Sequence, residues 1–414
     1  MSTGKILGDS SVSEIHKLSR DYCCMFRIRL VGLNSKTSID HPISASKCRH
    51  LYGKLTDDWI LDNGRIVSAI ALETTCTEQD LFTYEQFYSW DECQIFDLVV
   101  YRKQYLPTPF VKAILNLYKM KTELKDVPDR LVDYMVSKNM LNAAYGMTVT
   151  DIVREVLTYT EDDEYVSNYD SDDFNIEKFL ESQISKYNSN RRRFLFYPWG
   201  VWVTAYARAN LFSGILASGR DYIYSDTDSI KILNPSSHEN YIKAYNSEIE
   251  EKLRLACEFH NIPFSTTKPK NKYGKEKPLG VWDFEGVYDE FKTLGAKRYL
   301  WRKGDKWQLT VAGVNKFKGM EYLLLKAKEE NCSPFDLFHL DVYGDGALVI
   351  PQEYSGRMIL TYGHDEIVGM IKDYLGQPYQ YHELSYIHME PSDYTMDTIV
   401  SFIKFLQGVR EDSW

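Results

Sequence analysis

Two aspartates separated by one residue stand in the segment YSDTDS, at positions 224–229. The surrounding run DYIYSDTDSIKIL predicts an extended strand, in which alternate side chains share a face. Asp226 and Asp228 should therefore project together, with Tyr222 and Tyr224 on the same side. Adjacent carboxylates repel each other unless a cation lies between them, and Mg²⁺ suits hard oxygen ligands with an incomplete protein shell. The same composition also fits an ordinary polar turn, so the spacing alone leaves both interpretations open.

A second set of chemically useful side chains lies in KNMLNAAYG, at positions 138–146. Lys138, Asn142 and Tyr145 stand at i, i+4 and i+7, so one helical face carries an ammonium, an amide and a phenol. A solvated face would also tolerate these three groups. The functional interpretation is a face that meets a nucleoside triphosphate, with Lys138 on the phosphates and Tyr145 beside the sugar and base.

Together these segments resemble motifs of the family-B DNA polymerases. KNMLNAAYG is similar to the fingers motif K-x3-N-S-x-Y-G, and YSDTDS is similar to the palm motif Y-x-D-T-D-S. Between them, PWGVWVTAYAR resembles the palm helix of the phage-type, often protein-primed branch. YKMKTELK resembles a Y-x-x-K-T element of the first fingers helix, and LGAKRYLW resembles the segment whose K-x-Y motif holds the primer strand. The similarity runs from about Gly4 to about Lys316, and the remaining residues match more loosely, where a thumb is expected.

The resemblance implies DNA-templated DNA polymerisation, that is, nucleotidyl transfer assisted by two Mg²⁺ ions, with Mn²⁺ as an alternative. Its expected partners are primer–template DNA and dNTPs. Asp228 would be the principal catalytic metal ligand and Asp226 the secondary acid. The residues expected to bind the nucleotide are Lys121, Lys138, Asn142 and Tyr145, and those expected to contact the primer or DNA are Tyr224, Thr227, Lys297 and Tyr299.

The sequence departs from the family pattern in three places. Ala143 occupies the position of the serine in the fingers motif. The first palm motif, D-x2-S-L-Y-P, has no match, and the nearest string, which starts at Asp97, lacks its serine and proline. Because the matched region starts at about Gly4, we expect no 3′–5′ exonuclease domain in this sequence. Asp283-Phe284-Glu285 has the D-x-E spacing of such nucleases, but it follows the palm motif, which favours a structural role.

The segment GKILGDSS resembles sequence that follows the missing motif, so the chain is expected to begin just past it. We interpret the chain as the C-terminal subunit of a split polymerase, whose partner chain would carry the exonuclease and the first aspartate. A decayed gene would be expected to lose its metal and phosphate ligands early, yet these residues are present. The alternatives are a decayed, non-catalytic DNA-binding remnant, an accessory subunit of a replication complex, and an unrelated metal-dependent nuclease that uses Asp226 and Asp228.

The distribution of charge is uneven. The formal net charge is −10, which would disfavour a nucleic-acid partner if the charge were spread evenly. However, residues 161–173 contain seven acids and no base, whereas residues 268–306 contain eleven Lys or Arg against six acids. We expect the second window to bind the DNA backbone without sequence preference and with steep salt dependence. There is no apolar run of the length a membrane span needs and no apolar signal core, so we expect no membrane partner and a cytoplasmic location.

The elements that must position these groups are strands first and helices afterwards. The segments CMFRIRLVGL, RIVSAIALETTC and CQIFDLVVYRKQYL predict strands, and residues 107–125 and 129–144 predict two antiparallel helices, the second with Leu131, Met135 and Leu141 on its apolar side. Helices are also expected at 200–219, 247–259, 319–330, 364–374 and 394–406, so the fold class is α+β. By resemblance, the 414 residues form the palm, fingers and thumb portion of a right-hand polymerase, with helical-hairpin fingers on an antiparallel palm sheet. The expected segments are a β-rich palm-proximal part (1–106), fingers (107–146), an acidic insertion (147–198), palm (199–320) and a thumb-like part (321–414).

Overall fold

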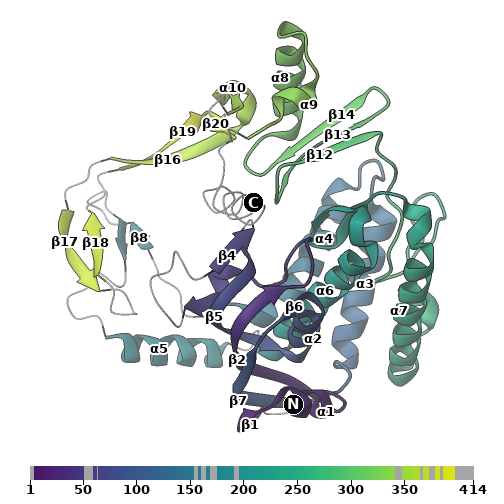
Figure 1. Cartoon of the computed structure of the whole chain (residues 1–414), viewed down its shortest axis with the longest axis vertical. Coiled ribbons are helices and arrows are strands. Elements are labelled where there is room, and N and C mark those ends of the chain that lie inside the picture. Colours follow the sequence, from purple (N-terminus) through teal and green to yellow (C-terminus); the bar gives the residue numbers. More distant parts are fainter. Residues whose placement is uncertain are drawn as a thin grey trace. The chain divides into compact units, whose positions relative to one another are not determined.

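The chain folds into two compact units (Figure 1). The computed structural model describes residues 4–50, 59–62, 64–152, 157–159, 165–167, 175–190, 195–340, 347–363, 367–372, 378–382 and 386–396. The first unit gathers Met1–Thr148 with Phe196–Val287, and the second gathers Val149–Leu195 with Tyr288–Asp397. Each unit is therefore built from segments that are distant in the sequence.

An antiparallel sheet forms the base of the first unit. Within the described residues its strands follow the order β1-β7-β2-β5-β3, with β4 also paired to β5 and β6 to β2. The long strand β2 alternates half-buried residues with the buried side chains Cys24, Phe26, Ile28 and Leu30, as expected of a sheet with one face on the core. The strands are β1 (Lys5–Ser10), β2 (Tyr22–Ser35), β3 (Cys48–His50), β4 (Trp59–Asp62), β5 (Arg65–Thr77), β6 (Tyr88–Ser89) and β7 (Glu92–Arg102).

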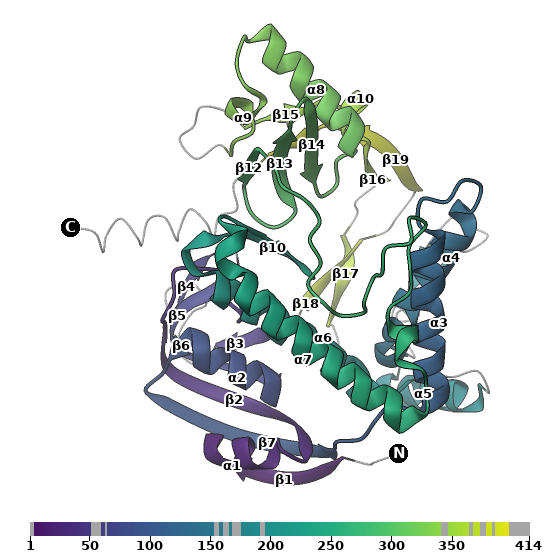
Figure 2. The ribbon, with the colours of Figure 1, turned by 90° about the vertical axis from the view of Figure 1, so that its right-hand side faces the viewer.

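Helices α2 (Glu78–Phe87) and α6 (Tyr197–Ser218) cover the buried face of this sheet (Figure 2). Phe87 of α2 meets Phe212 of α6 edge to face, with ring centroids 5.2 Å apart. Both rings belong to one hydrophobic core together with the inward side chains of β2, β5 and β7. Burial of this apolar surface fixes α6 against the sheet.

The remaining elements of the first unit extend from this base. Helices α3 (Thr108–Leu124) and α4 (Leu131–Gly146) pack against each other as an antiparallel hairpin. We call it the fingers hairpin, after the motifs that its sequence resembles. Strands β10 (Tyr222–Asp226) and β11 (Ser229–Ile232) form a short β-hairpin after α6. The other helices are α1 (Val12–Leu18), α7 (Glu239–His260) and the 3₁₀ turns Ala45–Lys47, Met147–Val149, Gly219–Asp221, Pro235–His238 and Phe264–Thr267.

The second unit has its own core. Strands β12 (Glu290–Thr293), β13 (Arg298–Lys303) and β14 (Lys306–Val311) form an antiparallel sheet, and α8 (Lys316–Glu329) packs on β14. Leu300, Leu309 and Leu323 are fully or almost fully buried at this contact. The other elements are α5 (Ile176–Ser189), α9 (Pro334–Leu337), α10 (Gln352–Ser355) and the strand pairs β8–β9 (Leu157–Tyr159, Tyr165–Ser167), β15–β20 (Val349–Ile350, Tyr394–Thr395), β16–β19 (Arg357–Gly363, Tyr386–Ser392) and β17–β18 (Ile367–Lys372, Pro378–His382).

The structure confirms the mixed architecture of helices and antiparallel sheets. The three expected N-terminal strands are β2, β5 and β7, and the expected helices at 107–125, 129–144, 200–219 and 319–330 are α3, α4, α6 and α8. The expected helix at 364–374 is wrong, because Ile367–Lys372 is strand β17, paired with β18. The expected helix at 394–406 begins with strand β20 and otherwise lies outside the described residues, as does most of the acidic run at 161–173. Among the helices that the structure describes, none combines the length and apolar character needed to cross a bilayer.

Candidate active site

The tip of the β10–β11 hairpin carries the two aspartates. The strands are in register up to the pair Asp226 and Ser229, so the chain reverses within two residues. Thr227 has φ 57°, and the Asp228 N–H donates to the Asp226 carbonyl oxygen over 2.6 Å. A β-branched residue in this left-handed region is strained, and such strain concentrates at functional sites. The turn presents both carboxylates at the end of the hairpin.

The expected geometry of these aspartates is wrong in one respect. Asp226 is the last residue of β10, but Asp228 lies in the turn and not in an extended segment. The left-handed conformation of Thr227 breaks the alternation of strand side chains, so strand geometry does not place the two carboxylates on one face. Both residues belong instead to the tight turn that joins β10 to β11.

The two carboxylates have different surroundings. Asp226 is half-buried and accepts a hydrogen bond from Thr227 Oγ1 over 2.9 Å. Asp228 is exposed, and its carboxylate forms no hydrogen bond or ion pair with the described residues. The part of the chain that the structure describes contains no group of three acidic, histidine or cysteine side chains placed to hold a metal ion. Two carboxylates in one turn fit an Mg²⁺ ion that takes its other ligands from water, substrate phosphates and a further protein oxygen.

Tyrosines in β10 attach the hairpin to the rest of the first unit. Tyr224 is buried, with 6% of its surface exposed. The Tyr222 hydroxyl lies 3.0 Å from Ser225 Oγ and donates to Asp40 Oδ2 over 3.4 Å, and burial raises its pKa. On the other strand, a Cβ at Gly214 of α6 would lie 2.5 Å from Ile230 Cδ1. Glycine is therefore needed at 214 for the close packing of β11 on α6.

Two buried carboxylates of α2 hold α6, and sequence reasoning missed both. Glu78 has no exposed surface and accepts hydrogen bonds from the Cys24 N–H (2.8 Å) and from Trp202 Nε1 (3.0 Å). Asp80 accepts two hydrogen bonds from Arg208, one from Nε (2.9 Å) and one from Nη2 (3.1 Å). Acidic residues at the start of α2 are typical of a helix N-terminus and could have been noticed in the sequence. Their partners on α6, however, are more than 120 residues away. These hydrogen bonds hold α6, the helix that leads into the β10–β11 hairpin.

Replacing Glu78 by glutamine should make the free energy of unfolding fall less steeply as the pH rises. Burial raises the pKa of Glu78 above its ordinary value of 4.5, although hydrogen bonds from Cys24 and Trp202 oppose the shift. The folded state then binds the carboxyl proton more tightly than the unfolded state, so stability is fully present below pH 4.5 and declines as pH rises through the folded-state pKa. A glutamine oxygen retains the two acceptor contacts without this titration.

Urea unfolding at several pH values checks this expectation. The wild-type free energy of unfolding should fall with pH more steeply than that of Glu78→Gln. Glu92→Gln, an exposed glutamate of β7, is the control and should keep the wild-type slope. Equal slopes for the wild type and Glu78→Gln would show that the pKa of Glu78 is the same in the folded and unfolded states.

The fingers hairpin presents the second group of expected residues. Lys138, Asn142 and Tyr145 all lie on α4, at the helical spacing expected from the sequence. Lys138 is half-buried, whereas Asn142 and Tyr145 are exposed. On α3, Lys121 is half-buried, with its Nζ 5.9 Å from the centre of the Tyr118 ring. The hairpin therefore carries two lysines, an amide and a phenol.

The expected apolar side of α4 is partly wrong. Leu131 and Met135 are exposed, at 68% and 42%, and Leu141 is half-buried. The buried residue of α4 is Ser137, whose hydroxyl donates to the Asp133 carbonyl oxygen over 2.8 Å. A small side chain allows helices to approach closely, so the packed face of α4 is not its most apolar face.

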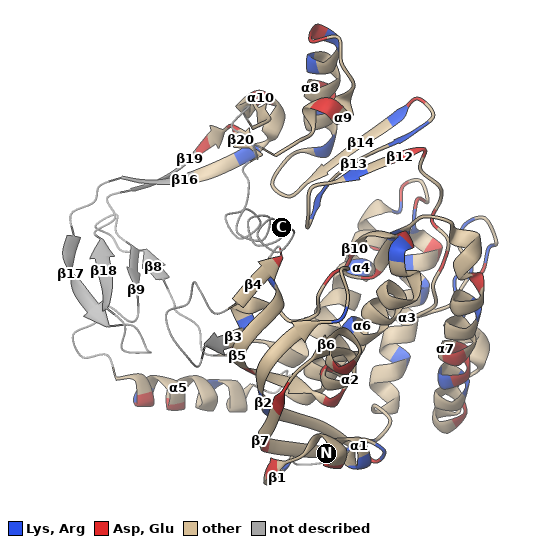
Figure 3. Cartoon of the chain, viewed as in Figure 1, with Lys and Arg blue, Asp and Glu red and all other residues tan. Residues whose placement is uncertain are grey.

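The second unit carries the residues expected to hold the primer. Lys297 has φ 56° in the turn before β13, and its carbonyl oxygen accepts the Ala312 N–H over 3.0 Å. Tyr299 lies in β13 and stacks on Phe291, with ring centroids 5.4 Å apart. Figure 3 shows Lys and Arg along the β13–β14 hairpin, where Arg298, Arg302, Lys303 and Lys306 add to the charge. The hairpin therefore carries four basic side chains against one acid, Asp305.

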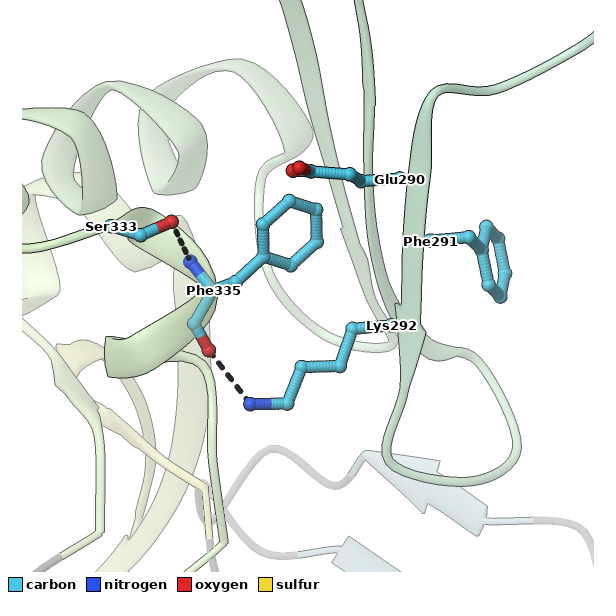
Figure 4. Close-up of a pocket in the computed structure, with 5 residues that line it drawn as sticks. All are labelled: Glu290, Phe291, Lys292, Ser333 and Phe335. Atoms are coloured by element: carbon cyan, nitrogen blue, oxygen red, sulfur yellow. Dashed lines mark hydrogen bonds between the residues drawn. The ribbon is translucent and has the colours of Figure 1, made fainter.

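A pocket of about 570 Å³ in the second unit is lined by Glu290, Phe291, Lys292, Ser333 and Phe335 (Figure 4). Its polar groups bind the protein itself. Lys292 Nζ donates to the Phe335 carbonyl oxygen over 2.7 Å, and burial lowers the pKa of this lysine. Ser333 Oγ accepts the Phe335 N–H over 3.3 Å. The pocket thus belongs to the packing of α9 against β12 and offers no convergent polar groups to a ligand.

The fold of the chain, including the turn at residues 226–229 that we call the aspartate turn, can be compared with solved structures. The chain folds like phi29 DNA polymerase. The orthorhombic crystal form matches with a TM-score of 0.52 and 14% identity, covering 95% of this chain and 54% of that chain. The complex with primer–template DNA matches with 0.51 and 15%, and the complex with single-stranded DNA with 0.52 and 15%.

The likeness to phi29 DNA polymerase concerns the fold. The chain spans about half the length of the solved polymerase chains that it matches. No family model matches the sequence, and no curated protein matches it either. The resemblance in the sequence motifs therefore has an independent counterpart in a distant polymerase-like fold.

Proposed function

We propose that the chain takes part in DNA-templated DNA synthesis as the palm and fingers portion of a family-B-like polymerase. The observation that carries the proposal is the aspartate turn at the tip of β10–β11, in a fold similar to phi29 DNA polymerase. The helical hairpin with Lys121 and Lys138 supports it. In phosphoryl transfer the protein contributes mainly positioning and charge stabilisation, and these residues are of the required types.

In the proposed mechanism, each group of the chain has one task. Asp226 and Asp228 would hold Mg²⁺, which lowers the pKa of the primer 3′-hydroxyl and neutralises the departing pyrophosphate. Lys121 and Lys138 would compensate the negative charge of the triphosphate from the fingers. Asn142 and Tyr145 would orient the sugar and base of the incoming nucleotide. The template base would choose the nucleotide by pairing.

We propose that the remaining residues of the polymerase-like motifs contact the DNA. Tyr224 and Thr227 flank the metal-binding aspartates, and Lys297 and Tyr299 would hold the primer backbone. Contacts of this kind fix the register of the duplex and carry no sequence information. We therefore propose binding without sequence preference and with strong dependence on salt.

We further propose that a second chain supplies another metal-binding carboxylate. This proposal rests on the sequence, which lacks a match to the first palm motif, and on the absence of a third suitable side chain with Asp226 and Asp228 among the described residues. Two Mg²⁺ ions need more charged oxygen ligands than one ion does, and a further carboxylate would help to hold both of them beside Asp226 and Asp228. The purified chain should then extend primers only when its partner is present.

Primer extension tests the proposal and separates it from the alternatives. The tagged chain is purified once alone, under conditions that strip bound proteins, and once with the proteins that accompany it in its native cells. The proposal predicts dNTP-dependent extension by the second preparation only. Robust extension by the chain alone would remove the need for a second chain. Degradation of DNA without dNTPs would indicate a nuclease, and DNA binding without either activity an accessory subunit.

Replacing Lys138 by methionine should raise the KM for dNTP about tenfold, because a charge-assisted contact with phosphate is lost. Lys112→Met is the matched control, since Lys112 is an exposed lysine of the neighbouring helix α3. Steady-state incorporation against dNTP concentration measures both variants. An unchanged KM for Lys138→Met would place Lys138 away from the triphosphate.

A further inference from the structure

Residues 268–286, which we call the strap, lie against α7 in the first unit. Lys268 Nζ forms an ion pair with Glu250 over 3.0 Å. The Asn246 side chain binds the strap backbone in both directions, donating to the Trp282 carbonyl oxygen over 2.9 Å and accepting the Trp282 N–H over 2.8 Å. These contacts join two parts of the strap to one helix.

The strap is also ordered internally. Asn271 Oδ1 accepts the backbone N–H groups of Tyr273 and Lys275, each over 3.0 Å. Lys275 and Lys277 both form ion pairs with Asp283. The burial of Asp283 opposes a low pKa, but the hydrogen bond and charge of Lys277 lower it. Much of the lysine charge in this part of the sequence is therefore used within the protein, and Asp283 has a structural role.

The same strap contacts the fingers hairpin near its tip. The Tyr118 hydroxyl of α3 donates to the Lys277 carbonyl oxygen over 3.1 Å, with the Pro278 carbonyl oxygen 3.4 Å away. Lys272 Nζ donates to the carbonyl oxygen of Asp126, in the loop between α3 and α4, over 2.6 Å. The strap thus contacts α3 at Tyr118 and the tip of the hairpin at Asp126.

At its other end the strap reaches the hairpin with the aspartates. Glu285 forms an ion pair with Lys231 of β11 over 3.3 Å. Trp282 packs close to α6, since a Cβ at Gly214 would lie 3.1 Å from its Cζ2 atom. One continuous segment therefore connects the β10–β11 hairpin to the fingers hairpin within the first unit (Figure 2).

We propose that the strap positions the fingers hairpin relative to the aspartate turn, and that Tyr118 is its principal positioning residue. Tyr118 is suited to this task because its hydroxyl holds the strap while its ring lies beside Lys121 Nζ. Its carbonyl oxygen also accepts the Thr122 hydroxyl over 2.8 Å, which stiffens the same turn of α3. The proposed contact of Lys121 with phosphate rests on the proposed function, whereas the connection itself does not.

Hydrogen exchange of the full chain tests the connection without any need for activity. Tyr118→Phe removes only the hydroxyl, so exchange should accelerate about three- to tenfold in peptides covering residues 116–126 and 270–280. Exchange in β2 and β5 should not change. Tyr134→Phe is the matched control, because the hydroxyl of this α4 tyrosine has no hydrogen-bond partner among the described residues. Equal exchange in the two variants would overturn the proposal.

A second pair of variants asks whether the strap acts as one unit. Lys272→Met should accelerate exchange in the same two peptides. Lys270→Met should not, because the exposed Lys270 side chain makes no hydrogen bond or ion pair with the described residues. In the variant with both Tyr118→Phe and Lys272→Met, the acceleration of exchange should be smaller than the product of the two single accelerations. Either substitution alone already loosens the same connection. Independent, fully multiplicative effects would contradict a single strap.

Kinetics then connect the strap to catalysis. In the preparation that extends primers, Tyr118→Phe should raise the KM for dNTP about threefold and leave kcat within about twofold, since the fingers lose orientation and the aspartates are untouched. Loosened exchange with an unchanged KM would overturn the positioning role. A wild-type preparation that never extends primers would overturn the proposed function, and the exchange results would still decide the connection.

Discussion

Replacing Asp228 by asparagine is expected to lower primer extension on the order of a thousandfold, because the metal-binding turn loses one of its two charges. Asparagine has nearly the same shape as aspartate, so the turn should persist. Asp228 is exposed and bonds to no described side chain, which means that its loss should cost little stability. Extension assays, with thermal unfolding measured in parallel, separate the two effects.

The matched control for this variant is Asp129→Asn. Asp129 is also an exposed aspartate in a turn, with φ 60°, at the tip of the fingers hairpin. Asparagine tolerates the left-handed region as well as aspartate does, so the control should keep both its fold and its activity. Loss of activity in both variants would indicate a general effect of surface charge, and full activity of Asp228→Asn would exclude Asp228 as a metal ligand.

Replacing Arg208 by alanine should destabilise the first unit by about 2 kcal/mol. The change leaves Asp80 buried without its two strongest donors, and breaking a fully buried pair costs about 3–5 kcal/mol. The smaller figure is appropriate because 45% of the Arg208 side chain is exposed and Asp80 keeps its bonds from Thr77. Since α6 leads directly into β10, the loss should also loosen the aspartate hairpin.

Chemical denaturation followed by tryptophan fluorescence measures the effect of Arg208→Ala. Arg220→Ala, which removes an exposed arginine just after α6, is the control and should change the free energy of unfolding by less than about 0.5 kcal/mol. Equal stabilities of the two variants would mean that α6 is held by apolar packing alone.

Local patterns predicted the elements that carry the site. The alternation of β2 and the helical spacing in α3 and α4 depend on neighbouring residues, and the structure confirms them. The apolar residues at 367–371 also fit a helix, but this segment forms a strand, in which β-branched Ile367 and Ile371 pair with residues of β18. Pairing between distant segments decides such ambiguous runs, and single-sequence patterns do not contain it.

Contacts over long sequence separation were the part that could not be predicted. Nothing near Glu78 or Asp80 indicates that Trp202 and Arg208 bind them, and nothing near Tyr118 indicates the strap at Lys277. The aspartate turn was missed for a local reason, because a left-handed threonine is too rare to expect. The roles of Lys297 and Tyr299 remain proposals that rest on sequence resemblance.

Incorporation of a single nucleotide opposite each template base is the decisive test of DNA-templated synthesis by this chain. The preparation that contains the chain with its native partners is mixed with a primer–template and one dNTP at a time, with Mg²⁺ present. We expect the primer to gain the complementary nucleotide at all four template bases, and we expect Asp228→Asn to abolish the gain. Failure to add any nucleotide, addition regardless of the template base, or an unimpaired Asp228→Asn variant would contradict this expectation.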